Sequence, residues 1–69
     1  MSNHVYKSVE ITGSSPEGVT QAIETAIQKA SKTVRNLDWF EVLSVRGQIA
    51  DGAVAHYQVT MKVGFRLED

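Results

Sequence analysis

The dipeptide Asp51-Gly52 stands between two long segments in which polar and apolar residues alternate, and it predicts a β-hairpin. A tight type I′ turn needs positive φ at both central positions, which aspartate and glycine tolerate. The segment 54–68 after the turn alternates cleanly. Its apolar face consists of Ala55, Tyr57, Val59, Met61, Val63, Phe65 and Leu67. A strand with such a face has to be covered on that side, and this requirement constrains the rest of the fold.

A strand and a helix precede the hairpin in the sequence. Residues 4–12 alternate as a strand, which we expect Gly13-Ser14-Ser15 to break. Ser15-Pro16-Glu17 is typical of a helix start, because the serine can cap backbone N–H groups and proline fits the first helical position. The predicted helix runs to about Arg35, and Asn36 is expected in a left-handed conformation after it. Its apolar stripe is Val19, Ala22, Ile23, Ala26, Ile27, Ala30 and Val34.

The order of these elements predicts an α+β fold, β-α-β-β, over a single domain that spans residues 1–69. The second strand is expected over 37–50. We expect a three-stranded antiparallel sheet whose last strand lies in the middle beside the first. One helix packs on one face, and we call the opposite face the outer face.

The size and charge of the chain limit the classes of function. A chain of 69 residues has a marginal core, and without cysteine it has no disulfide or thiolate metal site, so oligomerisation is the expected source of stability. The net charge of −1 argues against nucleic-acid binding. No stretch approaches the roughly 20 apolar residues of a membrane span. Residues 1–4 do not begin a signal peptide, so we expect a cytoplasmic protein.

The two-residue turn sets the pairing of the hairpin and places Trp39, the only tryptophan, on the outer face opposite Gly64. Phe40 and Val42 then fall on the helix side. A three-residue loop would invert these faces. We favour the shorter turn because it matches Phe40 and Val42 to the apolar face of the last strand.

The second strand is less regular than the third. Its apolar phase slips at Val42-Leu43, and Gly47 is a candidate β-bulge. The regular register places Val45 opposite Gln58 on the outer face and Arg46 on the helix side opposite Tyr57. Arg46 would therefore reach an outer-face site only through a bulge or near the hairpin tip.

The outer face carries more apolar surface than a wet face normally does, namely Trp39, Leu43, Val45 and Tyr6. Either another protein chain covers Trp39 or a flat ligand stacks on it. Gln58 lies six positions from the partner of Trp39, which is about 20 Å at the strand rise. A site that uses both Trp39 and Gln58 is therefore expected between subunits.

The whole chain resembles the dodecins, small flavoproteins that assemble as hollow shells of twelve subunits. The resemblance rests on four segments in their order: Ile11-Thr12-Gly13-Ser14-Ser15, the alanine-rich helix, Asn36-Leu37-Asp38-Trp39-Phe40-Glu41-Val42, and Tyr57-Gln58-Val59-Thr60-Met61-Lys62-Val63-Gly64-Phe65. It implies a homododecamer in which tryptophans from two subunits enclose a pair of stacked isoalloxazine rings.

The resemblance also implies the roles of individual residues. Trp39 would stack on the flavin and Gln58 would hydrogen-bond the ring edge, while Arg46 and Arg66 look like the arginines that hold the FMN phosphate. Ser44 stands where some archaeal relatives carry a carboxylate, which favours FMN over riboflavin. FAD is a further candidate, and some family members bind coenzyme A. The expected function is to store flavin and quench its photochemistry.

Two other classes of function compete with flavin storage. A structural or interaction module would use the outer face only for subunit contacts. A flavin-dependent enzyme would need an activated nucleophile, a positioned base or a nicotinamide motif, and we find none in the sequence, so we expect no catalytic residues. His4 and His56 have no carboxylate spacing typical of a metal site, so no metal is expected.

Overall fold

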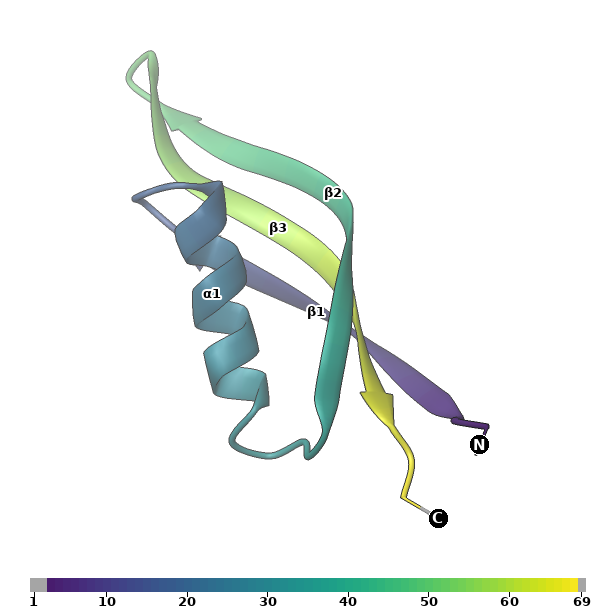
Figure 1. Cartoon of the computed structure of the whole chain (residues 1–69). Coiled ribbons are helices and arrows are strands. Elements are labelled where there is room, and N and C mark those ends of the chain that lie inside the picture. Colours follow the sequence, from purple (N-terminus) through teal and green to yellow (C-terminus); the bar gives the residue numbers. More distant parts are fainter. Residues whose placement is uncertain (1–2, 69) are drawn as a thin grey trace.

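The computed structural model describes residues 3–68, so positions 1, 2 and 69 of the predicted domain lie outside the described residues. The elements are β1 (Tyr6–Ser15), α1 (Val19–Ala30), β2 (Leu37–Ala50) and β3 (Ala53–Arg66). They form one antiparallel sheet in the order β1-β3-β2, with α1 on one face (Figure 1). The predicted β-α-β-β architecture, with the last strand in the middle, is confirmed.

β1 does not end at Gly13, as the sequence suggested, but continues through Ser15. Gly13 pairs with Val59 in the sheet and lies beneath α1. A Cβ atom at position 13 would collide with the backbone carbonyl of Ala22 and would lie 2.8 Å from the Cβ atom of Ala26. This glycine is therefore required by the close approach of helix and strand, and it does not interrupt the strand.

The helix is shorter at both ends than the predicted range. The Ser15 hydroxyl accepts a hydrogen bond from the Glu17 backbone N–H at 3.0 Å, so it closes a tight turn before the helix and does not cap it. Ser15 stays in the ladder of β1, which delays the helix start to Val19. Beyond Ala30 the chain turns, and Asn36 has φ of 66°, the left-handed conformation expected from the sequence.

The hairpin turn has the predicted geometry. Asp51 and Gly52 have φ of 52° and 76°, and Ala50 pairs directly with Ala53. The alternative with a three-residue loop is therefore excluded. Phe40 pairs with Val63 as predicted.

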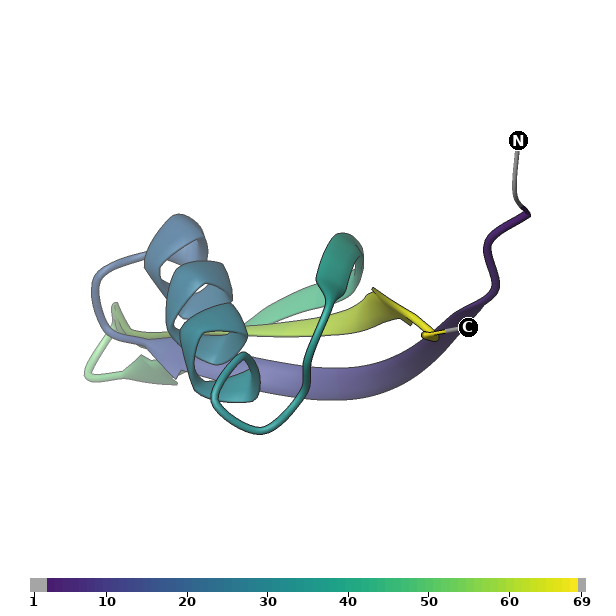
Figure 2. The ribbon, with the colours of Figure 1, turned by 60° about the horizontal axis from the view of Figure 1, so that its bottom comes forward.

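The core is small and reaches β2 only at its first residue, Leu37. It consists of Ala22, Val59, Met61 and Val63, with partly buried residues of α1, β1 and Leu37 packed around it. α1 packs on β1 and β3 (Figure 2). Phe40 and Val42 lie on the predicted face but are 47% and 40% exposed. The expectation that the helix buries them was wrong, because one helix covers only two of the three strands.

Two irregularities in β2 decide which side chains reach the outer face. The register shifts between Leu37 and Trp39 and again between Val42 and Ser44, so Asp38 and Leu43 are extra residues in the strand. Gly47, the bulge candidate from the sequence, is regularly paired with Tyr57, and a third shift follows Gln48.

The shifts at Leu43 and after Gln48 correct two predictions. Val45 pairs with Val59 on the helix side and not with Gln58. Arg46 pairs with Gln58 on the outer face and not with Tyr57. The physical reason is that residues 44–48 lie between two irregularities, so their pairing with β3 is displaced by one residue, whereas Ile49 and Ala50 keep the pairing that the turn sets.

Candidate functional site

Trp39 lies on the outer face because Asp38 is an extra residue in β2. Residues two apart in a regular strand share a face, but the bulge lets Leu37 turn toward the core while Trp39 turns outward. The indole lies directly over Gly64. A Cβ atom at position 64 would collide with ring atoms Cε2 and Cζ2 of Trp39. The absence of a side chain at Gly64 thus makes room for the ring, which remains 39% exposed.

Tyr6 flanks the indole from β1, on the other side of β3. The two ring centroids are 6.5 Å apart and the planes are inclined at 63°, an edge-on aromatic contact. A hydrogen bond from the Tyr6 hydroxyl to the Asp38 carboxylate raises the pKa of Tyr6 above its ordinary value near 10, and desolvation and the Asp38 charge act in the same direction. Asp38, which the sequence did not single out, therefore belongs to the surroundings of Trp39.

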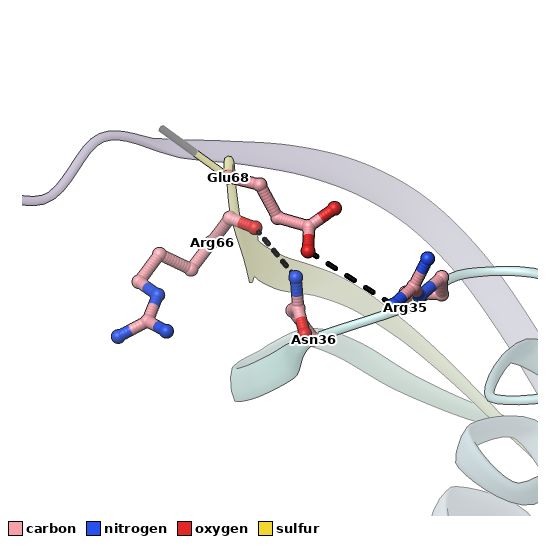
Figure 3. Close-up of polar contacts among 4 residues, drawn as sticks. All are labelled: Arg35, Asn36, Arg66 and Glu68. Carbon is pink, nitrogen blue, oxygen red and sulfur yellow. Dashed lines mark hydrogen bonds and ion pairs between the residues drawn. The ribbon is translucent and has the colours of Figure 1, made fainter.

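Arg66 lies at the same end of the outer face and pairs with Tyr6 across the sheet. Its backbone is held by Asn36: the Arg66 N–H donates to the Asn36 carbonyl at 3.1 Å, and Asn36 Nδ2 donates to the Arg66 carbonyl at 3.4 Å. An exposed ion pair between Arg35 and Glu68 at 3.9 Å lies beside these two hydrogen bonds. Figure 3 shows the Arg66 guanidinium pointing away from these three residues.

Gln58 and Arg46 form the other end of the outer face. Gln58 is exposed in the middle strand and lies between Ser14 of β1 and Arg46 of β2, its two cross-strand partners. The next row toward the centre is also polar, with the Thr12 and Thr60 hydroxyls 3.0 Å apart. An amide that donates and accepts therefore lies beside a guanidinium that only donates.

The structure brings the four predicted site residues together in two pairs and not in one cluster. Arg46 lies beside Gln58, and Arg66 lies near Trp39. Trp39 pairs with Gly64, six residues from Gln58 on β3, so the two ends are about 20 Å apart within one chain. The hollow that Trp39 borders lies mainly on the helix side, where Ile27, Leu37, Phe40 and Val63 line it, and not on the outer face. On the outer face the indole remains partly exposed, so one chain alone does not enclose a ring system there.

Within residues 3–68, no three histidine or acidic side chains gather closely enough to hold a metal ion. No helix in the same range is long and apolar enough to cross a membrane.

Comparison with known proteins gives one consistent family. A family model described as Dodecin matches residues 5–68. The Thermus thermophilus dodecin is 54% identical over 65 residues, which cover 94% of each chain. The solved dodecin from Streptomyces davaonensis is 63% identical, with a TM-score of 0.93 over 99% of this chain and 100% of the other.

Three solved variants of the Thermus protein replace residues of the same types as Trp39, Arg46 and Arg66. In separate structures a tryptophan is replaced by phenylalanine, and each of two arginines is replaced by alanine. The first arginine follows the tryptophan by seven positions and the second follows the first by twenty. Trp39, Arg46 and Arg66 have the same spacing. These structures match this chain at 51% identity, cover 97% of it and have TM-scores of 0.91, 0.92 and 0.91.

Proposed function

This chain belongs to the dodecin family, and from this premise we propose that it binds and sequesters a flavin, FMN before others, without turning over a substrate. Flavin binding is the general function of dodecins. The proposal for this chain concerns which residues hold the flavin, which flavin is preferred, and what binding does to its photochemistry.

The observation that carries the proposal is the exposed indole of Trp39 lying over Gly64. A glycine beneath the ring keeps the indole close to the sheet, and the exposed part of the ring offers a flat apolar surface. Stacking on an aromatic ring contributes about 0.5–1.5 kcal/mol beyond the burial of area. The isoalloxazine ring of a flavin fits this surface because it is flat, large and mostly apolar on its faces.

The pair formed by Gln58 and Arg46 supports a flavin with a phosphate group. The Gln58 amide can both donate to and accept from the carbonyl and N–H groups of the flavin edge. A guanidinium forks onto phosphate oxygens, so Arg46 and Arg66 would add contacts for FMN that riboflavin lacks. FAD offers phosphates as well but brings a second nucleotide that the site would have to place. Coenzyme A is the other phosphate-bearing candidate from the family resemblance.

The separation of Trp39 and Gln58 supports a site between copies of the chain. About 20 Å of β3 separates them, and the indole of Trp39 is left partly exposed by its own chain. A second copy that places its Gln58 end near the first copy's Trp39 would complete the site. The homododecamer of the family resemblance is the assembly we propose, and the exposed apolar face of β2 is consistent with it.

The bound flavin would supply a light-absorbing ring, and the chain would supply an electron-rich indole in contact with that ring. In this arrangement Trp39 shortens the lifetime of the excited ring and so suppresses its photochemistry. Arg46, Arg66 and Gln58 only bind and orient the ligand. Sequestration and quenching thus require no catalytic residue.

The test is a titration of the protein with FMN, riboflavin, FAD and coenzyme A, followed by flavin fluorescence and by calorimetry. We expect the strongest binding for FMN, with loss of its fluorescence. In Trp39→Ala we expect binding to weaken by at least tenfold, because two stacked faces per ligand pair are lost. Trp39→Phe is the matched control, since it keeps an aromatic surface and should retain part of the affinity.

Two outcomes would decide against the proposal. Unchanged FMN affinity in Trp39→Ala would remove Trp39 from the site. No heat with any of the flavins would favour a structural module whose outer face only makes subunit contacts, and heat with coenzyme A alone would assign the site to that ligand instead.

A further inference from the structure

Trp39 is held on several sides by groups of its own chain. Gly64 lies beneath the ring, and Tyr6, which the flavin site described above does not use, contacts it edge-on from β1. Asp38 precedes Trp39 in the chain and is the extra residue that separates its face from that of Leu37. Tyr6 and Trp39 come from the two edge strands, so their contact spans the middle strand above Gly64.

We propose that Tyr6 is a positioning residue: its ring, in edge-on contact with Trp39, fixes the indole over Gly64 as a preformed stacking surface. The inference deepens the proposed function and rests on it. It concerns the flavin-free protein as well, because the contacts among Tyr6, Trp39 and Gly64 exist within one chain.

The geometry supports a positioning role more than a ligand contact for the Tyr6 ring. An inclination of 63° and a centroid distance of 6.5 Å mean that Tyr6 meets the indole at an angle and does not continue its plane. A second stacked surface for the same flavin would need a parallel ring. Edge-on pairs of this kind add a directional attraction that restrains rotation of both rings.

The Asp38 carboxylate on the other edge strand supports this role of Tyr6. Side-chain hydrogen bonding with Asp38 is the largest cause that raises the pKa of the Tyr6 phenol, and the nearby charge of Arg66 opposes this increase only as a smaller effect. The phenol therefore stays protonated throughout the neutral range.

Restraining Trp39 before the ligand arrives would favour binding. A side chain that is already immobile loses less conformational entropy when the flavin stacks on it. Loss of the edge contact should therefore weaken FMN binding by roughly two- to tenfold, the range that corresponds to one aromatic pair. The chain has only one tryptophan, so its emission reports on this residue alone.

The experiment compares the flavin-free full chain with Tyr6→Ala, Tyr6→Phe and Gly64→Ala by the anisotropy of tryptophan emission and by acrylamide quenching. We expect lower anisotropy and stronger quenching of the tryptophan emission in Tyr6→Ala. Tyr6→Phe should give an intermediate result, because it keeps the ring and loses the hydroxyl group. Gly64→Ala should displace the indole from its place over the sheet. It therefore shows the anisotropy and quenching expected when Trp39 is no longer held in position. Tyr57→Ala on the helix side is the matched control and should not change the tryptophan signal.

A second readout is the affinity for FMN of the same variants. The proposal is overturned if Tyr6→Ala keeps the anisotropy, the quenching and the FMN affinity of the parent chain. If Tyr6→Ala does not fold, Tyr6→Leu and Tyr6→Phe decide by the same criteria. If the parent chain binds no FMN, the proposed function fails, whereas the tryptophan signals still decide whether Tyr6 positions Trp39.

Discussion

Gln58 has polar neighbours on both sides on the outer face. It lies in the middle strand, so both neighbouring strands present a side chain beside it, Ser14 on one side and Arg46 on the other. Trp39 has a comparable arrangement at the opposite end, with Tyr6 at its edge and Gly64 beneath it. Each end is thus a small set of contacts built on a cross-strand row, which is the basic unit of side-chain contact in a sheet.

The place of Arg46 beside Gln58 gives a prediction at the scale of single residues. Arg46→Ala should weaken FMN binding about tenfold to a hundredfold, because a charge-assisted hydrogen bond contributes about 1.5–3 kcal/mol. Riboflavin binding should change by less than about threefold, since riboflavin has no phosphate for a charged partner. The measurement is a pair of fluorescence titrations with the two flavins.

The control for Arg46 is Lys29→Ala, which removes an exposed cation from α1, on the opposite face of the sheet. Arg66→Ala is the comparison variant and should also lower the affinity for FMN more than the affinity for riboflavin. Equal losses for FMN and riboflavin in Arg46→Ala would mean that Arg46 supports the fold or the assembly and not the phosphate.

At the scale of elements, the bulges in β2 matter more than the length of the strand. The extra residue Asp38 separates the faces of Leu37 and Trp39, and the extra residue Leu43 separates those of Val42 and Ser44. Without these shifts, β2 could not place a core residue, an outward tryptophan and an outward arginine on one strand. The bulges thus make one edge strand serve both faces of the sheet.

The packing of α1 on β1 gives a prediction for the elements. Gly13→Ala should lower the free energy of unfolding by about 1–3 kcal/mol, because the new Cβ atom collides with the backbone of α1, which cannot move aside as a side chain can. Chemical denaturation at fixed protein concentration measures this change. The tryptophan signal of the folded variant should stay like that of the parent, since Trp39 lies on the other face.

Gly47→Ala is the matched control for Gly13→Ala. It adds the same methyl group to a strand glycine, but the nearest atom is the His56 carbonyl oxygen at 3.0 Å, and α1 is not involved. We expect the smaller loss of stability at Gly47. A loss at Gly13 no larger than that at Gly47 would contradict the close helix–sheet packing described here.

The whole chain is too extended for an isolated domain of its size. Its radius of gyration is 14.4 Å and its extents are 55 × 20 × 15 Å, whereas a compact domain of this length has a radius of about 11 Å. The described residues of β2 are exposed apart from the partly buried Leu37. The apolar side chains of Phe40, Val42 and Val45 therefore lie on the helix side of β2 without cover from α1.

This shape predicts that the chain is stable only as an oligomer. Light scattering should give a mass well above the 7.6 kDa of one chain, near twelve times that value for the proposed dodecamer. Phe40→Glu places a charge on the uncovered face and should shift the chain toward smaller species, with loss of FMN binding in proportion. Gln28→Glu adds the same charge on the exposed side of α1 and is the control.

A folded monomer of the parent chain that binds FMN would contradict both the oligomer and the shared site. A second check of the shared site is to assemble Trp39→Ala and Gln58→Ala chains together. Mixed oligomers should contain some sites with parental affinity, because an intact tryptophan of one chain meets an intact glutamine of another. Sites formed within one chain would show no such recovery.

The sequence by itself determined the elements, the turn and the strand order. These follow from local periodicity and from the conformations that Asp51, Gly52 and Asn36 tolerate, and such effects act between neighbours in the chain. The outward position of Trp39 opposite Gly64 was predicted from the same turn, and the prediction holds because the shifts after Gln48 and at Leu43 cancel. The resemblance of the chain to dodecins pointed to Gln58, Arg46 and Arg66.

Only the tertiary structure decided where β1 ends, how much of the sheet α1 covers and on which face Arg46 lies. Each depends on contacts between residues distant in sequence: Gly13 with Ala22, α1 with two strands and not three, and the register of β2 on β3. The irregularities at Leu43 and after Gln48 displace the pairing of residues 44–48, yet their positions depend on which pairing buries the core best. Alternation within one strand does not contain that information, because burial is a property of the packed molecule.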